Sequence, residues 1–228
     1  MKDKFVRCEY LLGDNALERL KNKRVALFGV GGVGGYTLEA LVRTGVGNID
    51  VFDSDTVDIT NFNRQILAVD SELGNKKTDA AYHRAKAINK DVNIVKHDVF
   101  YLPETADSVD LSVYDYIVDA IDTVTAKIEL IVRATNLNVP IISVMGTGNK
   151  LDATRLTVSD IYKTENCPLA RVMRYELKKR GVRKLKTVWS PEIPAKITVD
   201  EDGKKHSPAS AVFVPAAAEM IASGQVIK

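Results

Sequence analysis

A glycine-rich turn between an apolar run and a helix-like segment is the feature that most constrains this chain. Residues 25–35 read Val-Ala-Leu-Phe-Gly-Val-Gly-Gly-Val-Gly-Gly, and Gly29, Gly31 and Gly34 have the spacing G-x-G-x-x-G. The first glycine permits a tight turn, the second lets the backbone approach a phosphate, and the third lets helix and strand pack closely. A second apolar run ends at Asp53, nineteen residues after Gly34 and placed to bind a ribose. These features predict a nucleotide site rather than a turn without a ligand.

Apolar strand patterns alternate with helix patterns along most of the chain. The expected strands are residues 24–30, 48–53, 93–100, 114–119, 139–145, 155–159 and 185–189. The expected helices are residues 34–44, 76–89, 102–109, 124–137, 168–180 and 211–228, after a short helix capped by Asp14. Because such alternation forms parallel sheets, we expect an α/β fold. Its core would be a Rossmann-like doubly wound, mostly parallel sheet with an antiparallel C-terminal extension.

Composition excludes several other classes of protein. Hydrophobic residues make up 45% and charged residues 27% of the 228 residues, so a sizeable core is expected and wholesale disorder is excluded. The net charge of +2 leaves any affinity for nucleic acid to a local patch. Two cysteines cannot form a four-cysteine zinc site, and the three histidines lack metal-ligand spacing. We find no signal peptide and no transmembrane segment in the sequence, and we expect a cytoplasmic enzyme.

Polar groups expected at the carboxyl ends of the strands favour ATP over a redox dinucleotide. A nucleoside triphosphate needs several cations for its phosphates and a carboxylate that holds Mg²⁺. Arg64 and Lys77 supply cations, and Asp119 or Asp122 supplies the carboxylate. The alternatives are a surface ion pair for Arg64 and helix capping for the two aspartates, although capping and metal binding can coexist.

Five separated motifs resemble, in their order, the adenylation domain of the ubiquitin-activating superfamily. That superfamily includes the bacterial adenylyltransferases of thiamine and molybdopterin synthesis. The motifs are Gly29-Val-Gly-Gly-Val-Gly34, Asp53-Ser-Asp-Thr-Val57, Thr60-Asn-Phe-Asn-Arg-Gln65, Gly74-Asn-Lys-Lys77 and Asp119-Ala-Ile-Asp122. The resemblance implies an ATP-binding adenylation core over residues 1–150. Residues 151–228 would then be a C-terminal extension of the same domain, with a basic helix and a flap loop.

The resemblance also implies a role for each matching residue. Asp53 would hold the ribose hydroxyls, Lys77 would stabilise charge at the α-phosphate, and Asp122 would hold Mg²⁺. Arg7 would reach across a homodimer interface to the triphosphate, and the competing interpretation is a solvated chain terminus. The catalytic residues implied are Arg7, Arg64, Lys77 and Asp122. The nucleotide-binding residues implied are Gly29, Gly31, Gly32, Gly34, Asp53, Asp55, Asn61, Arg64, Gln65 and Lys77.

The second half of the chain resembles the tRNA threonylcarbamoyladenosine dehydratases. The similarity lies in residues 143–155, in Ile161-Tyr-Lys-Thr164 and in Pro168-Leu-Ala-Arg171. It implies an enzyme that adenylates the carboxylate of threonylcarbamoyladenosine in tRNA and closes it to a hydantoin, with ATP and Mg²⁺ as cofactors. The resemblance further implies a homodimer, and a sulfur-relay protein is a partner of some relatives.

Two other functions stay open from the residues. One is adenylation of the C-terminus of a ubiquitin-like sulfur-carrier protein, although the C-x-x-C pairs usual in those enzymes are missing here. The other is an NAD-dependent oxidoreductase or a nucleotide-binding regulator, against which Arg64, Lys77 and Asp122 argue. Cys167 precedes a helix whose N-terminus could lower its pKa, but no histidine is nearby in the sequence. We therefore interpret Cys167 as incidental.

Eight basic residues against one acid distinguish residues 171–186. Such a run is either a solvated helix face or a patch that tracks the phosphates of an anticodon arm, with affinity falling as salt rises. Trp189 or a tyrosine could stack on a flipped base. No DNA partner is expected. The tRNA-binding residues expected in this segment are Arg174, Lys178, Lys179, Arg180 and Arg183.

Overall fold

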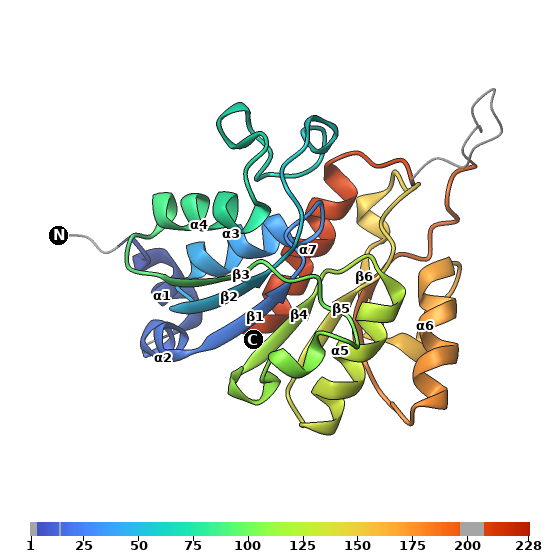
Figure 1. The fold of residues 1–228 in the computed structure, drawn as a ribbon. Helices are drawn as coiled ribbons and strands as arrows, with labels where there is room; N and C mark the ends of the chain where they lie inside the picture. Colours follow the sequence, from blue (N-terminus) through green and yellow to red (C-terminus); the bar gives the residue numbers. More distant parts are fainter. Residues whose placement is uncertain (1–3, 14, 197–207) are drawn as a thin grey trace.

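One seven-stranded sheet organises the molecule. The computed structural model describes residues 4–13, 15–196 and 208–228 (Figure 1). In the described chain the strand order is β3-β2-β1-β4-β5-β7-β6, and only the β7–β6 pair is antiparallel. This confirms the expected doubly wound, mostly parallel sheet. The strands are β1 Arg24–Phe28, β2 Asn48–Phe52, β3 Asn93–His97, β4 Tyr116–Asp119, β5 Ile141–Val144, β6 Thr157–Asp160 and β7 Lys186–Trp189.

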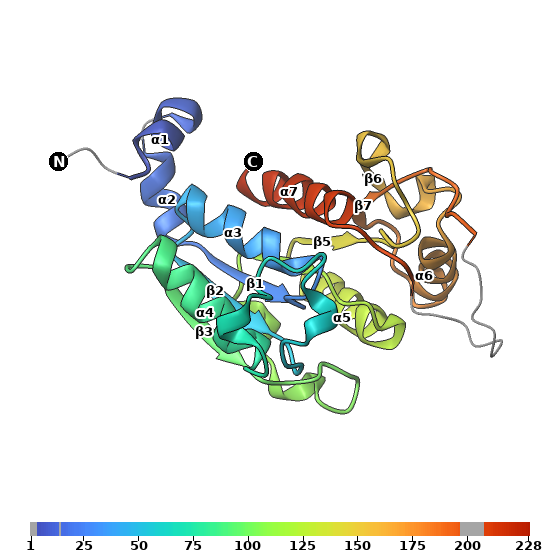
Figure 2. The ribbon, with the colours of Figure 1, turned by 90° about the horizontal axis from the view of Figure 1, so that it is seen from above.

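Helices cover both faces of this sheet. Helices α3, α4 and α7 pack on one face, and α5 and α6 pack on the other (Figures 1 and 2). Because both faces are covered, the strands are buried on both sides and read as continuous apolar runs. The helices are α1 Val6–Leu12, α2 Ala16–Asn22, α3 Gly34–Thr44, α4 Lys77–Ile88, α5 Val124–Asn136, α6 Pro168–Lys179 and α7 Phe213–Ile227.

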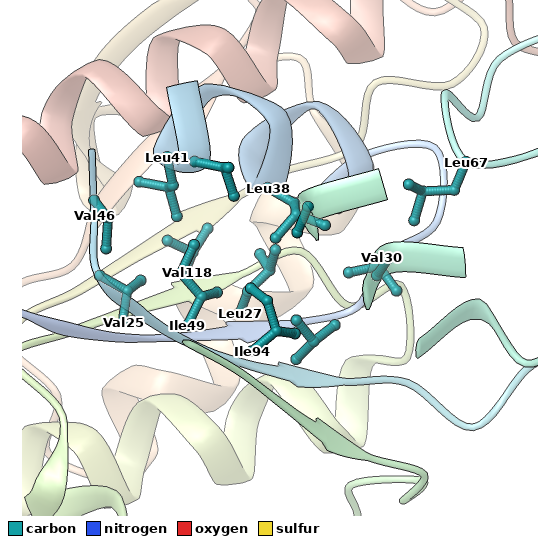
Figure 3. Packing of buried hydrophobic residues seen from close by; sticks show 14 of the residues in the cluster. Val25, Leu27, Val30, Leu38, Leu41, Val46, Ile49, Leu67, Ile94 and Val118 are labelled. Atoms are coloured by element: carbon teal, nitrogen blue, oxygen red, sulfur yellow. The ribbon is translucent and has the colours of Figure 1, made fainter. Parts of the chain in front are cut away.

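The packing of α3 on the sheet fixes the position of the glycine turn. Leu38 and Leu41 of α3 lie in the same buried cluster as Leu27, Ile49 and Val118 of three neighbouring strands (Figure 3). Each of these side chains is fully buried. Burial of one such side chain stabilises the fold by about 1.5–3 kcal/mol. The start of α3 is therefore held firmly above the end of β1.

Residues 102–109 do not form the helix that the sequence predicts. This segment is a loop with a single 3₁₀ turn, Ala106–Ser108. The Thr105 hydroxyl accepts the Leu102 N–H at 2.9 Å and donates to the Phe100 carbonyl at 2.8 Å. A side chain that bonds nearby backbone groups in this way competes with helix formation. The preceding strand is also shorter than expected, because β3 ends at His97.

The two ends of the chain differ in detail from the prediction. The sequence did not predict α1, and the expected cap Asp14 lies outside the described residues, with Asn15 at the N-cap of α2. The C-terminal part extends the same sheet, because β7 lies parallel to β5 and only β6 runs antiparallel. Within the described residues, no helix combines the length and apolar character needed to cross a bilayer.

A buried ion pair joins the first three strands of the chain. Asp50 of β2 has a side chain only 1% exposed, and Arg24 of β1 donates to both of its carboxylate oxygens at 2.8 Å. His97 Nε2 of β3 lies 2.8 Å from the same carboxylate, and the Tyr114 hydroxyl donates to it at 3.1 Å. Burial acts to raise the pKa of Asp50, but these hydrogen bonds lower it below its usual value.

We expect R24M to destabilise the protein by about 1–3 kcal/mol at pH 7, because the buried Asp50 carboxylate loses a partly exposed guanidinium but keeps its bonds to His97 and Tyr114. The lowered pKa of Asp50 means that the pair stabilises the fold above the usual aspartate range and loses this contribution as pH falls through the folded-state value. Urea unfolding from pH 7 to pH 3 measures both effects. A difference between wild type and R24M that grows toward low pH would contradict this account.

Candidate functional site

A cavity of about 620 Å³ opens at the carboxyl ends of β1, β2, β4 and β5. It lies where the strand order reverses, with the loop after β1 leading to α3 on one face and the loop after β4 leading to α5 on the other. Ligands of open α/β sheets bind at such switch points. Of the predicted nucleotide-binding residues, those that line the cavity are Gly29, Gly31, Gly32, Asp53, Asp55, Asn61, Arg64, Gln65 and Lys77.

The glycine turn has the close contacts that its spacing predicts. Gly29 has a φ of +85°, and a Cβ at this position would lie 2.8 Å from the Ala120 carbonyl oxygen. A Cβ on Gly34 would lie only 1.7 Å from the Gly29 carbonyl oxygen. Gly31 and Gly32 expose backbone toward the side chains of Lys77 and Arg64. Gly34 does not line the cavity and acts through packing, as the third glycine of the motif should.

A carboxylate from the C-terminal helix binds the first turn of α3. Glu219 Oε2 of α7 accepts the backbone N–H groups of Tyr36 at 2.5 Å and Thr37 at 2.9 Å. Burial raises the pKa of Glu219 well above its usual value, and the two backbone hydrogen bonds offset this only in part. Gly31, Gly32 and Val33, which precede α3, line the cavity at the N-terminus of this helix, where anions are attracted. Sequence reasoning missed Glu219 because its partners lie more than 180 residues away.

Asp53, which follows β2, stabilises the glycine turn through hydrogen bonds. Its carboxylate accepts the Val30 N–H at 2.8 Å and the Asp55 N–H at 2.9 Å. Burial raises the pKa of Asp53, and the charge of Lys77 and the two N–H donors act in the opposite direction. Both carboxylate oxygens of Asp53, a residue that lines the cavity, are thus fixed by backbone donors.

Lys77 and Arg64 bring two cations to the glycine turn. Lys77 begins α4, its side chain is 7% exposed, and its Nζ lies 2.8 Å from the exposed carboxylate of Asp55. Arg64 lies against Gly32, and its guanidinium donates to the Thr60 carbonyl at 2.8 Å. Both cations are therefore held near the turn by groups that a phosphate could replace.

A short 3₁₀ helix, Ile59–Asn61, positions Arg64 and its neighbours. Asp58 caps it, because its carboxylate accepts the Thr60 N–H while Asn61 Oδ1 accepts the Asp58 N–H. Asn61 and Gln65 are buried at the cavity wall. The polar segment between β2 and α4 is thus an ordered platform.

The two candidate metal carboxylates have different environments. Asp119 is fully buried, and its carboxylate binds Lys127 at 2.9 Å and the Ser143 hydroxyl at 2.5 Å. Asp122 is exposed, lines the cavity, and accepts only a 3.3 Å hydrogen bond from Thr123 among the bonds of its carboxylate in the described chain. The carboxylate of Asp119 is therefore occupied by partners within the fold, and the carboxylate of Asp122 is the one available to a ligand.

Magnesium is a metal ion that the residues of this cavity could hold together with a bound nucleotide. No group of three His, Cys, Asp or Glu side chains suited to a metal occurs in the parts of the chain that the structure covers. Magnesium needs no such group, because it keeps several waters and binds through one or two carboxylates together with substrate phosphates. A single carboxylate beside two phosphate-facing cations fits this mode.

Arg7 does not line the cavity. It is exposed on α1, which projects from one edge of the fold (Figure 2). Within one chain its guanidinium therefore contributes nothing to the site. Any contact with a bound nucleotide requires a second copy of the chain.

The sequence did not assign the part of the cavity away from Arg64 and Lys77 as a binding surface. This part is mainly apolar, and its residues 144–148 and Leu169 belong to segments that the sequence marked only by resemblance. Pro208, Ser210 and Pro215 come from the connection to α7 and its first turn. The other lining residues in this group are Val99, Phe100, Tyr101, Val144, Met145, Gly146, Thr147, Gly148 and Leu169.

The segment of α6 presents a basic surface, but Arg174, Lys179 and Arg180 are bound locally, Lys179 to Glu176 at 3.7 Å. The Arg174 guanidinium donates to the Thr164 carbonyl at 2.9 Å, and Arg180 pairs with Glu176 at 2.5 Å. The positions that are exposed in this segment include Lys178, Lys179, Arg180 and Arg183. Tyr175 is 62% exposed among them, with the Lys179 ammonium 3.9 Å from its ring centre.

Two other predicted candidates belong to the core beneath α6. Trp189 is buried, and its indole N–H donates to Ser159 Oγ at 2.8 Å, so the prediction that it could stack on a base is wrong. Cys167 is also buried in this cluster, at the N-cap of α6. The exposed Tyr175 is the tyrosine on this face that is able to stack.

Comparison with known proteins gives matches over most of the chain. Residues 7–191 match the ThiF family. The tRNA threonylcarbamoyladenosine dehydratase of Bacillus subtilis is 39% identical over 241 residues, covering 100% of this chain and 94% of that protein. The crystal structure of the Escherichia coli tRNA N6-threonylcarbamoyladenosine dehydratase with AMP matches with a TM-score of 0.90 and 30% identity. The same enzyme with ATP matches with a TM-score of 0.86 and 30% identity. Each match covers 98% of this chain and 92% of the solved chain.

We expect G34A to lower stability by about 1–3 kcal/mol, since the added methyl group overpacks against the Gly29 carbonyl. It should also abolish nucleotide binding, because the turn must shift. The matched control is G224A in α7, where an added Cβ meets nothing within 4 Å. Thermal unfolding and titration with a fluorescent adenine nucleotide measure the two effects. Equal nucleotide affinity in G34A and G224A would refute the role of this close contact.

Proposed function

This chain belongs to the ThiF family, and on that premise we propose that it is an ATP-dependent tRNA threonylcarbamoyladenosine dehydratase. The observation that carries the proposal is the match to dehydratases along the whole chain, at 39% identity to the Bacillus subtilis enzyme. The cavity supports it independently, because a glycine turn, two cations and a carboxylate converge there. A hydride-transfer enzyme would have no need of this concentration of phosphate-binding charge.

The proposed reaction removes one water in two steps. The threonyl carboxylate attacks the α-phosphorus of ATP, which forms an acyl adenylate and releases pyrophosphate. The neighbouring ureido nitrogen then attacks the activated carbonyl, closes a hydantoin ring, loses its proton and releases AMP. Adenylation is needed because oxide is a poor leaving group from a carboxylate. Ring closure is intramolecular, so proximity supplies much of its rate and no enzyme nucleophile is required. The buried Cys167 fits this scheme.

We assign the residues around the cavity by the groups that they present. The glycine turn, Asn61 and Gln65 would bind phosphate oxygens, and Asp53 would bind the ribose hydroxyls. Arg64 and Lys77 would stabilise the charge that develops during attack at the α-phosphate, which is the main demand of such a transfer. Lys77 would exchange its bond with Asp55 for one with the phosphate.

Magnesium and a second subunit would complete the site. Asp122 would hold Mg²⁺, which when bound neutralises phosphate charge and orients the triphosphate. Arg7 would come from the partner of a homodimer, because its own cavity lies out of its reach. Residues 1–150 would form the ATP-binding adenylation core, and residues 151–228 would extend the same domain. We also infer a cytoplasmic location from the proposed tRNA-modifying role, and a sulfur-relay protein is a candidate partner.

The alternative is adenylation of a ubiquitin-like sulfur carrier. The same cavity chemistry would serve it, because that reaction also activates a carboxylate with ATP. The absence of C-x-x-C pairs in the sequence and the basic face of α6 favour tRNA.

Incubation with Mg-ATP and tRNA that carries threonylcarbamoyladenosine should release AMP and lower the mass of the modified nucleoside by one water. We expect K77A to slow this reaction about 100-fold, the typical effect of removing a group that stabilises the transition state. The control is K76A, the neighbouring lysine, whose side chain is exposed. Mass spectrometry of the digested tRNA and AMP quantification give the result. AMP release that needs a carrier protein and no tRNA would support the alternative function.

Reversing the charge of Lys178, Lys179 and Arg183 to glutamate should weaken tRNA binding and leave ATP binding unchanged. The affinity of a phosphate-tracking patch falls linearly with salt on a logarithmic scale, so the triple variant should also show a shallower salt slope. The control reverses the exposed Arg19 and Lys21 of α2 and Lys90, two residues after α4, because α2 and α4 lie at the opposite side of the molecule from α6 (Figure 1). Filter binding at several salt concentrations measures both. An equal tRNA affinity for the two triple variants at low salt would exclude α6 as the binding surface.

A further inference from the structure

The first turn of α5 holds a fully buried lysine directly beneath the cavity. Lys127 has 0% exposure, and its Nζ lies 2.9 Å from Asp119 Oδ2. The same ammonium donates to the carbonyls of Ile121 and Val144, both at 3.0 Å. An ammonium has three hydrogens, so these three acceptors use its full donor capacity. Lys127 therefore points entirely into the fold and makes no direct contact with a ligand.

Two of the three acceptors of Lys127 belong to residues that line the cavity. Ile121 and Val144 both line it, at the ends of the loop after β4 and of β5. Asp119 receives the Ser143 hydroxyl on the same oxygen that binds Lys127, and its other oxygen accepts the Ile121 N–H at 3.2 Å. The Asp119–Lys127 pair thus holds both the N–H and the carbonyl of Ile121.

Ile121 is the residue immediately before Asp122. On the other side of Asp122, the backbone enters α5, where the Lys127 N–H donates to the Thr123 carbonyl at 3.0 Å. The Asp122 side chain itself has only the 3.3 Å hydrogen bond from Thr123 within the described chain. The direction of the Asp122 carboxylate is therefore set by its backbone, and the buried pair fixes that backbone.

Stability alone does not explain a lysine at this position. A buried ion pair is often no more stabilising than apolar residues of the same volume. An ammonium in the first turn of a helix is also unfavourable to the helix dipole. A methionine of similar size would fill the same space but could not donate a hydrogen bond to the Ile121 carbonyl. It would also lose the bonds to Val144 and Asp119.

We propose that Lys127 is a positioning residue that orients Asp122 toward the metal bound with ATP. This inference rests on the proposed ATP and magnesium site. In metal sites, groups that orient a ligand contribute about 10- to 100-fold to metal affinity. Lys127 acts on Asp122 through the backbone of Ile121, and none of the three bonds of its ammonium is to the glycine turn, Asp53 or Lys77. The variant K127M should therefore lose the contribution of magnesium to ATP binding and keep the metal-independent part.

Calorimetric titration of ATP, without tRNA, tests this with Mg²⁺ and with EDTA. We expect Mg²⁺ to tighten ATP binding by wild type, and D122N to remove that gain. K127M should reduce this Mg²⁺-dependent increase in ATP affinity about 10-fold and leave the ATP affinity in EDTA unchanged. When K127M is added to D122N, the ATP affinity in Mg²⁺ should fall no further. A general distortion of the cavity would instead weaken ATP binding equally in both conditions.

Two further variants test whether the effect of K127M comes from a loss of folded structure. D119N/K127M removes both charges of the buried pair, so it leaves no unpaired charge, and it should show the same loss of the Mg²⁺ gain as K127M. K150M is the matched control, since Lys150 is also buried and donates to backbone carbonyls, those of Ser190 and Glu192. K150M should keep the gain. A full Mg²⁺ gain in K127M or D119N/K127M would overturn the positioning role. If the wild type binds ATP equally well with Mg²⁺ and with EDTA, the proposed magnesium site is wrong, and this inference is wrong with it.

Discussion

The close approach of the glycine turn to the end of β4 is the contact on which the rest of the site depends. Gly34 lies against the Gly29 carbonyl, and Gly29 lies against the Ala120 carbonyl, at distances that admit no side chain. Because α3 is also packed on the sheet by Leu38 and Leu41, the turn cannot move away. The backbone of the glycine turn and the residues at the end of β4 therefore line the same cavity. The charged residues of the site surround this cavity.

Charged side chains around this cavity are paired within the chain. Lys77 binds Asp55, Asp53 accepts two backbone N–H groups, and the buried Asp119 binds Lys127. Such pairing holds the groups in place and lowers the reorganisation needed when a polyanion arrives, which is the basis of electrostatic preorganisation. Asp122 differs from the others because its carboxylate is exposed and weakly bound. The hydrogen-bond and ion-pair partners of each side chain thus distinguish the groups that support the site from the groups that can contact a ligand.

The C-terminal segment supplies parts of the site that come from far along the chain. Glu219 of α7 binds the start of α3, and Pro208, Ser210 and Pro215 close one side of the cavity. Helix α7 packs beside α3 and against β5 and β7, so the nucleotide-facing turn and the C-terminal helix form one unit. A substitution that loosens α7 should therefore act on the phosphate region even though it lies outside every recognisable motif.

The sequence by itself determined the parallel sheet, the turn and the nine predicted nucleotide-binding residues that line the cavity. Their signals are local, since apolar runs, glycine spacing and residues that follow strand ends are fixed by neighbours in the chain. The residues alone, without the family resemblance, could not separate Asp119 from Asp122, and the sequence did not identify Trp189 as a core residue or foresee Lys127 and Glu219. Those outcomes depend on burial and on partners from other elements, such as Ser143 for Asp119 and Ser159 for Trp189. Only the tertiary structure decides them, because the free energy of a buried polar group is set by the atoms that the fold brings to it.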